Sequence, residues 1–87
     1  MKREELRRQL AELIASATDG DVPAEVALRG DAPLSALGMT SLATLRLVDV
    51  VEARYGVALD PADTAVFDGV DALADHLTRH GLAVEAA

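Results

Sequence analysis

Apolar residues recur at helical spacing in three stretches of the chain. In the first stretch, residues 3–17, they alternate with charged and polar residues at intervals of three and four, which is the pattern of an amphipathic helix. These apolar positions are Leu6, Leu10, Leu13, Ile14 and Ala17. The stretch ends at Thr18-Asp19-Gly20, and glycine favours the left-handed conformation found after many helices. We therefore predict a first helix over 3–17.

The central stretch predicts a second helix from Ser41 to about Tyr55, ending at Gly56. At about 3.6 residues per turn, the face expected to pack in the core carries Thr44, Leu47, Val48, Val51 and Tyr55. A second face carries Leu42, Arg46, Asp49 and Ala53. This face mixes one leucine with two charges and begins beside Ser41. We therefore expect it to be exposed and open to partner proteins.

Two shorter patterns follow. Asp60-Pro61-Ala62-Asp63 places proline directly after a capping residue, which predicts the start of a brief helix ending near Phe67. The last apolar stripe predicts a third long helix, closed by Arg79-His80-Gly81. Its members are Val70, Leu73, Ala74 and Leu77. We expect residues 82–87 to form a frayed tail.

Between Gly20 and Thr40 the pattern predicts a long loop with one helical turn at 34–37. Single apolar residues are spaced along it as anchors: Val22, Val26, Leu28, Leu34 and Leu37. The complete pattern predicts an all-α bundle with three longer helices, one short helix and a long loop between the first two. A length of 87 residues suits one small domain over 1–87.

Composition narrows the possible functions. Tyr55 and Phe67 are the only aromatic residues and cysteine is absent, so we expect an aliphatic core, no disulfide and a reducing, cytoplasmic environment. No stretch is apolar for long enough to cross a membrane. Early charges such as Glu4 and Glu5 interrupt any signal peptide. A net charge of −7 repels nucleic acid and anionic lipid and attracts basic enzymes.

Ser41 is the candidate for covalent chemistry. Gly38 and Thr40 interrupt the chain just before the second helix, so Ser41 is expected in its first turn. Unpaired N–H groups and a partial positive charge there favour a phosphate. The alternative is that Ser41 simply caps the helix, because serine is a preferred capping residue.

The segment Leu37-Gly38-Met39-Thr40-Ser41-Leu42 resembles the L-G-x-D-S-L signature of acyl and peptidyl carrier proteins. The resemblance covers nearly the whole chain and implies a four-helix bundle. It also implies that 4′-phosphopantetheine from coenzyme A esterifies Ser41, and that the thiol of this arm holds an acyl or aminoacyl group as a thioester. Such a protein carries its cargo and does not catalyse. Where the family most often has aspartate, this chain has Thr40.

The resemblance places the chain in fatty-acid, polyketide or nonribosomal-peptide biosynthesis, as a monomer. The implied partners are a phosphopantetheinyl transferase, an adenylating or acyltransferase loading enzyme, and downstream biosynthetic enzymes. The residues expected to meet them are Gly38, Met39, Thr40, Leu42, Leu45, Arg46 and Asp49. Arg46 and Asp49 are three residues apart and are expected to pair. Recognition should then depend on Leu42 and Leu45.

Other classes of function fit less well. A serine hydrolase needs glycine two residues on either side of its nucleophile, and these positions hold Met39 and Ala43. His76 and His80 share a helix face but have no evident third ligand, so we predict neither an enzyme nor a metal site. One rival stays open, namely an unmodified helical interaction module with a carrier-like fold.

Overall fold

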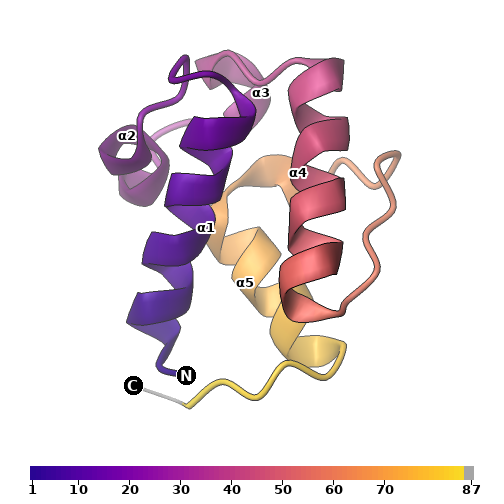
Figure 1. Cartoon of the computed structure of the whole chain (residues 1–87). Coiled ribbons are helices and arrows are strands. Elements are labelled where there is room, and N and C mark those ends of the chain that lie inside the picture. The colour runs from indigo at the N-terminus through magenta and orange to yellow at the C-terminus, as the bar shows by residue number, and fades with distance from the viewer. Residues whose placement is uncertain (86–87) are drawn as a thin grey trace.

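The computed structural model describes residues 1–85, which form a helical bundle (Figure 1). Its elements are α1 (Arg3–Ala17), α2 (Ala24–Arg29), α3 (Leu34–Leu37), α4 (Ser41–Tyr55), the 3₁₀ turn η1 (Val66–Asp68) and α5 (Val70–Arg79). The described residues contain no named strand and one isolated bridge. The all-α class predicted from the sequence is confirmed.

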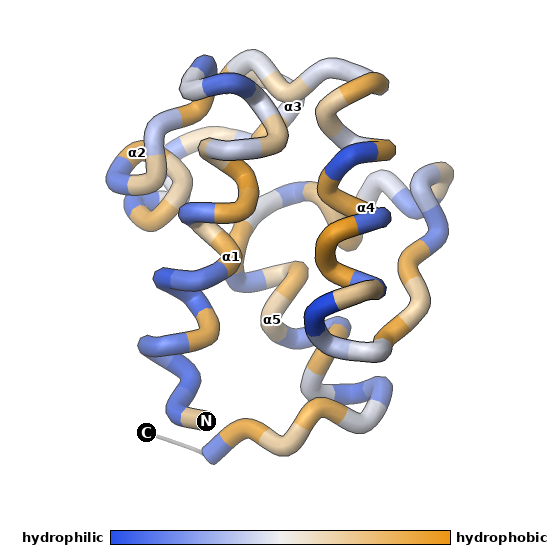
Figure 2. Tube along the Cα trace, in the orientation of Figure 1, coloured by the Kyte–Doolittle hydropathy of each residue, from blue (hydrophilic) through white to orange (hydrophobic). Residues whose placement is uncertain are grey.

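Helix α1 is the centre of the bundle. It contacts α2, α4 and α5, and Figure 1 shows α5 running obliquely between α1 and α4. Leu6, Leu10, Ala11 and Ile14 have no exposed surface. In Figure 2 the hydrophilic segments of α1 lie along its outer side, while the hydrophobic ones face the other helices. The amphipathic pattern of 3–17 therefore predicted the helix and its buried face correctly.

Arginine side chains also join α1 to α5. Arg3 pairs with Asp71 at 3.3 Å and with Asp75 at 2.9 Å, and Arg7 pairs with Asp71 at 2.9 Å. We expect each pair to contribute little, because the aspartates are exposed and water screens the charges. Within α1, Arg7 also pairs with Glu4 at 3.2 Å. The pairs between helices link segments that are far apart in the sequence.

Helix α4 has the two faces that its pattern predicted. Ala43, Leu47, Val48 and Val51 are buried, although the pattern did not assign Ala43 to the core. Thr44 and Tyr55 are only half-buried. The Tyr55 hydroxyl donates to Oε1 of Gln9 at 2.8 Å, so a polar contact joins the end of α4 to α1.

The predicted loop between α1 and α4 contains a helix that the sequence analysis missed. Pro23 precedes α2, and Gly30 ends it in the left-handed conformation at φ 65°. Ala27 is buried against the core, and the Leu28 carbonyl accepts a hydrogen bond from Arg7 at 3.0 Å. A six-residue helix is too short to be stable alone, so packing against α1 holds it. The helical turn expected at 34–37 is α3.

The brief helix predicted from Asp60 is wrong. Side chains stop the chain from coiling there: the Leu59 amide donates to Oε2 of Glu52 at 2.8 Å, and Leu59 is itself buried. Asp60 accepts from the Ala62 amide at 2.9 Å, which closes only a turn. Between Asp60 and Asp68, only residues Val66–Asp68 are helical, and they form a 3₁₀ turn.

The frayed tail expected from Leu82 onward is not what the described residues show. The Leu82 amide donates to the Leu77 carbonyl at 2.9 Å, and the Glu85 amide donates to the Met1 carbonyl at 2.8 Å. Leu82 and Val84 also pack against the core. Apolar side chains therefore hold residues 82–85 in place. Residues 86 and 87, which belonged to the same prediction, lie outside the described part.

Tyr55 gives a direct test of this packing. Burial raises the pKa of Tyr55 above its ordinary value, and the nearby Arg54 guanidinium lowers it by less. The folded protein then holds the phenol proton more tightly than the unfolded chain. This stabilisation is complete below the unfolded pKa of about 10 and is lost as the pH rises through the folded pKa.

Because the chain has one tyrosine and no tryptophan, phenolate absorbance reports Tyr55 alone. We expect a higher titration midpoint in the folded protein than in denaturant. Tyr55→Phe should abolish the signal, and by losing the bond to Gln9 it should lower the free energy of unfolding by about 0.5–1.5 kcal/mol. Equal titration midpoints in the folded and the denatured protein would contradict the burial of the Tyr55 phenol.

Candidate functional site

A short connection between α3 and α4 sets the position of Ser41. Gly38 ends α3 in the left-handed conformation at φ 114°, where a side chain would strain the backbone. The Met39 amide then donates to the Leu34 carbonyl at 3.1 Å, which closes the turn. The connection from α3 to α4 is thus only three residues long, and α4 begins at the exposed Ser41.

Thr40 caps helix α4. Its Oγ1 accepts a hydrogen bond from the Ala43 amide at 3.1 Å. Its carbonyl accepts from the Thr44 amide at 2.9 Å and from the Thr44 hydroxyl at 3.0 Å. Ser41 is therefore the first helical residue, and the alternative that Ser41 is the cap is wrong. Aspartate, usual at this position of the carrier signature, would accept the same bond and add a charge.

The Ser41 side chain is exposed. Within residues 1–85 its hydroxyl has no hydrogen-bond partner in the protein. It stands at the positive end of a helix of 15 residues, where N–H groups of the first turn lack partners within the helix. A phosphate on this oxygen would be stabilised by that end of the helix.

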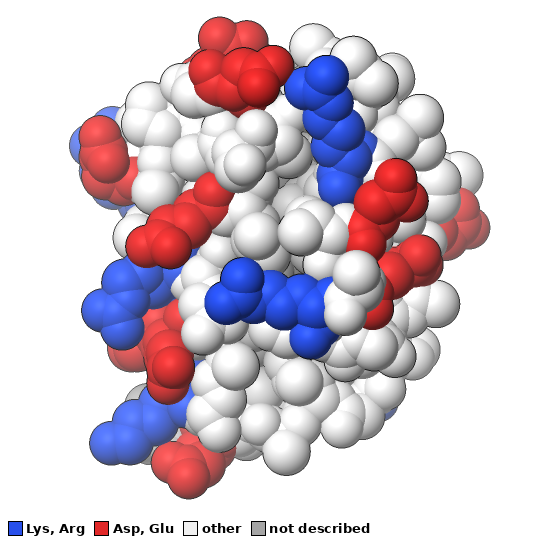
Figure 3. Space-filling view, in the orientation of Figure 1, with Lys and Arg blue, Asp and Glu red and all other residues white. Residues whose placement is uncertain are grey.

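The exposed face of α4 runs away from Ser41. Leu42 and Leu45 are 57% and 51% exposed, and Arg46 and Asp49 are exposed as well. Arg46 pairs with Asp19 of the α1–α2 loop at 3.1 Å, so the predicted pairing of Arg46 with Asp49 is wrong. Figure 3 shows both signs of charge interspersed over α1 and α4, around uncharged surface. The face is therefore not a uniformly acidic patch.

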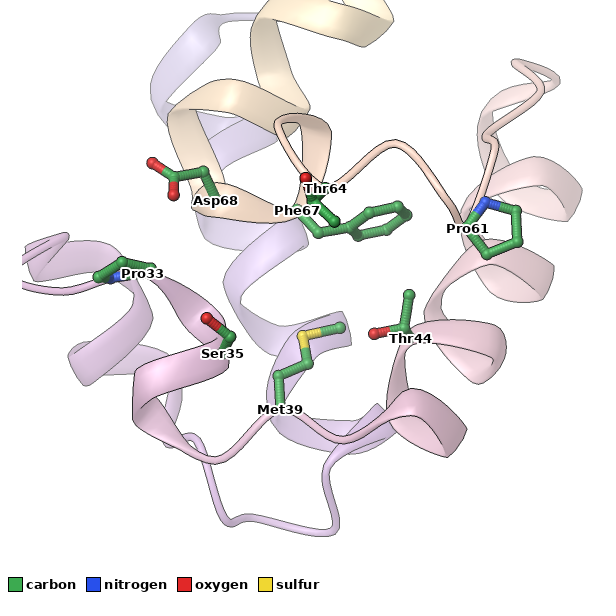
Figure 4. Close-up of a pocket in the computed structure, with 8 residues that line it drawn as sticks. All are labelled: Pro33, Ser35, Met39, Thr44, Pro61, Thr64, Phe67 and Asp68. Atoms are coloured by element: carbon green, nitrogen blue, oxygen red, sulfur yellow. The ribbon is translucent and has the colours of Figure 1, made fainter.

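A groove opens on another side of Ser41, between the start of α4 and the segment 61–68. We call it the serine groove. Its outer part has a volume of about 330 Å³ and is lined by Met39, Thr40, Ser41, Thr44, Leu45, Pro61 and Thr64. Its inner part, about 140 Å³, shares Met39, Thr44, Pro61 and Thr64 and adds Pro33, Ser35, Phe67 and Asp68 (Figure 4).

The sequence pattern predicts Met39, Thr40, Ser41 and Leu45 at the site, but it does not predict the far wall of this groove. Pro61, Thr64 and Phe67 are 20 or more residues away from Ser41 along the chain. They were assigned to a brief helix with no functional role. No local pattern could connect them with the serine, because an irregular loop brings them there.

His76 and His80 form a separate cluster. Their ring centroids are 4.2 Å apart, and Nε2 of His76 lies 3.2 Å from the Ala58 carbonyl oxygen. Among the described residues, no group of three or more histidine, cysteine, aspartate or glutamate side chains is arranged to hold a metal ion. No described helix is long and apolar enough to cross a membrane.

Comparison with known proteins adds the decisive observation. Residues 8–77 match the family described as phosphopantetheine attachment site. The chain belongs to this family. No curated protein and no solved structure matches the chain.

The resemblance drawn from Leu37–Leu42 is thereby confirmed. This carrier takes a covalent 4′-phosphopantetheine, and members of the family hold cargo without catalysing reactions. Carrier domains interact with the enzymes that modify them and with biosynthetic enzymes.

The capping bond of Thr40 can be tested by stability. Thr40→Val keeps the shape of the side chain but removes the acceptor for the Ala43 amide. We expect it to lower the free energy of unfolding by about 1 kcal/mol. Thr40→Asp keeps an acceptor and adds an anion at the helix start. Its free energy of unfolding should therefore equal that of the parent or exceed it by about 0.3–1 kcal/mol.

Urea unfolding, monitored by circular dichroism, measures the free energy of unfolding of both variants. Thr64→Val is the matched control, because it makes the same change on the opposite wall of the groove, where no capping bond is present. If Thr40→Val loses no more free energy of unfolding than the control, the capping bond does not contribute to stability.

Proposed function

We propose that Ser41 bears the 4′-phosphopantetheine arm and that the chain is a carrier for acyl, aminoacyl or peptidyl intermediates. The observation that carries this proposal is the exposed Ser41 hydroxyl, which has no hydrogen-bond partner among residues 1–85, while Thr40 caps α4. In the attachment, Ser41 Oγ bonds to the phosphorus that bears pantetheine in coenzyme A. The bond to adenosine bisphosphate breaks, and the hydroxyl proton leaves to a base of the transferase.

The surroundings of Ser41 suit this group. The helix start stabilises the phosphate charge, and the groove beside the oxygen leaves space for the arm. The other two serines have different settings. Ser16 lies near the end of α1, and Ser35 is the second residue of the four-residue α3. Neither opens a long helix.

The arm supplies a thiol on which cargo is held as a thioester in fatty-acid, polyketide or nonribosomal-peptide biosynthesis. Tethering raises the effective concentration of the cargo at each partner without release. We propose that the transferase, an adenylating or acyltransferase loading enzyme, and downstream enzymes bind the exposed face of α4. On α4 the proposed binding residues are Leu42, Leu45, Arg46 and Asp49, and the connection before α4 adds Gly38, Met39 and Thr40. The carrier is proposed to act as a cytoplasmic monomer and as one domain. The core cluster formed by the described residues supports the last of these points.

Attachment at Ser41 is tested by intact mass. After incubation with coenzyme A and a broadly specific transferase, the parent and Ser35→Ala should each gain one phosphopantetheine mass. Ser41→Ala should gain none and should unfold at the same temperature as the parent, because the hydroxyl makes no bond in the fold. A mass gain in Ser41→Ala would move the attachment point. A parent that no transferase modifies would favour the unmodified interaction module instead.

Partner recognition is tested by two substitutions on adjacent residues. Leu45 is half-exposed, so a partner that buries the rest of it gains about half of the roughly 1.5–3 kcal/mol that full burial of a leucine is worth. We therefore expect Leu45→Ala to reduce loading efficiency by roughly three- to tenfold. Arg46→Ala should cost less, because Arg46 is already paired with Asp19. Loading kinetics at two salt concentrations separate these effects. A larger, strongly salt-dependent loss for Arg46→Ala would show that charge governs recognition.

A further inference from the structure

Asp19 holds Arg46 across the seam between the end of α1 and the first turns of α4. Nη1 of Arg46 lies 3.1 Å from Oδ2 of Asp19, and the two side chains are 49% and 81% exposed. An exposed ion pair adds little to stability. The pair does decide where the charge of Arg46 lies, and Arg46 is the first cation after Ser41 along the chain.

The backbone of Asp19 holds its side chain at this seam. Its φ is 53°, and no other residue of 1–85 apart from glycine has a positive φ. The Asp19 amide donates to the Ser16 carbonyl at 3.2 Å, and the Gly20 amide donates to the Ala15 carbonyl at 2.8 Å. Aspartate and asparagine adopt this left-handed conformation more readily than most other residues with a side chain. Asp19→Asn therefore removes the charge and preserves the turn.

Two small hollows adjoin Arg46, and its side chain and Ala17 line both of them. The first, which we call the Val50 hollow, measures about 160 Å³, and the second, the Leu42 hollow, about 130 Å³. The Val50 hollow is completed by Leu13, Ser16 and Val50. The Leu42 hollow is completed by Thr18, Asp19, Asp21, Gly38, Thr40, Leu42 and Ala43. A partner that covers Thr40 and Leu42 beside Ser41 therefore also meets the pair of Arg46 and Asp19.

The charges left around this surface are acidic. Asp21 lines the Leu42 hollow, and Asp49 is exposed on α4. Neither forms an ion pair with another residue of the described part. Leu42, 57% exposed, supplies apolar surface beside them. While Arg46 is paired, the surface is complementary to a partner that presents apolar side chains with a basic rim.

We propose that Asp19 is a positioning residue that sets which partners this carrier accepts: by neutralising Arg46 beside the attachment point, it admits partners with an apolar surface and a basic rim. The inference rests on the proposed attachment at Ser41 and deepens the proposed recognition by α4. Without the Asp19 carboxylate, the guanidinium of Arg46 is an uncompensated cation that repels such a rim. Asp19 acts through Arg46 and need not touch the partner.

The test measures transfer of phosphopantetheine from coenzyme A by a broadly specific transferase with a basic carrier-binding surface. Intact mass follows the reaction over a range of carrier concentrations, so kcat and KM are obtained separately. Asp19→Asn should lower kcat/KM roughly three- to tenfold, mainly through KM, because the repulsion acts on binding. The loss should shrink between about 0.05 M and about 0.5 M salt, because salt screens exposed charges.

Asp21→Asn is the matched control. It makes the same change of total charge in the lining of the same hollow, but it leaves Arg46 paired with Asp19. Its effect on kcat/KM should be clearly smaller than that of Asp19→Asn. Circular dichroism should show the same helical content in both variants and in the parent.

A second substitution separates the charge of Arg46 from any structural role of Asp19. In Asp19→Asn/Arg46→Gln the freed cation is gone, and kcat/KM should return to within about twofold of the parent. If Asp19 only supported the turn after α1, removing the charge of Arg46 would not restore the reaction.

Three outcomes would overturn the inference. They are equal kcat/KM for Asp19→Asn and Asp21→Asn, a loss in Asp19→Asn that Arg46→Gln does not relieve, and a loss that does not change with salt. A parent chain that gains no phosphopantetheine mass would instead overturn the proposed function on which the inference rests.

Discussion

Burial of one face of α1 is the constraint on which the rest of the bundle depends. Leu6, Leu10, Ala11 and Ile14 have no exposed surface, and α1 contacts α2, α4 and α5. Shortening one of these leucines to alanine would cost about 2–5 kcal/mol, a large part of the stability of a typical domain. The six-residue α2 and the irregular segment before α5 are too weak to form alone. They take their places because α1 and the surrounding core hold them.

Two adjacent residues at the start of α4 differ in role: Thr40 caps the helix, and Ser41 is the proposed attachment point. Thr40 accepts the capping hydrogen bond from Ala43, so Ser41 is not needed to hold the helix together. Its hydroxyl stays exposed at the positive end of the helix, where a phosphodiester is stabilised. The missing aspartate of the carrier signature therefore removes a charge but not the structural role of that position. Any effect of Thr40 on modification should arise from recognition by the transferase and not from a damaged helix.

The segment after α4 contains little regular structure, but it shapes the surface beside Ser41. Glu52 accepts a hydrogen bond from the Leu59 amide, and Leu59 is buried, so the chain leaves α4 as an anchored, irregular segment. This course places Pro61, Thr64 and Phe67 opposite the start of α4 and forms the serine groove. Had these residues formed the predicted helix, the groove would have a different wall. The shape of the serine groove therefore depends on a few side-chain anchors.

The sequence by itself determined the three long helices, the exposed face of α4 and the position of Ser41 at a helix start. Helical periodicity and terminating glycines act over a few residues, so a local reading can find them. Only the tertiary structure decided the conformation of the segments with weak local preferences. It formed α2, left the stretch after Asp60 irregular, held residues 82–85 against the core and paired Arg46 with Asp19 instead of Asp49. These outcomes depend on partners distant in the chain, and for short segments such contacts outweigh the small local preferences.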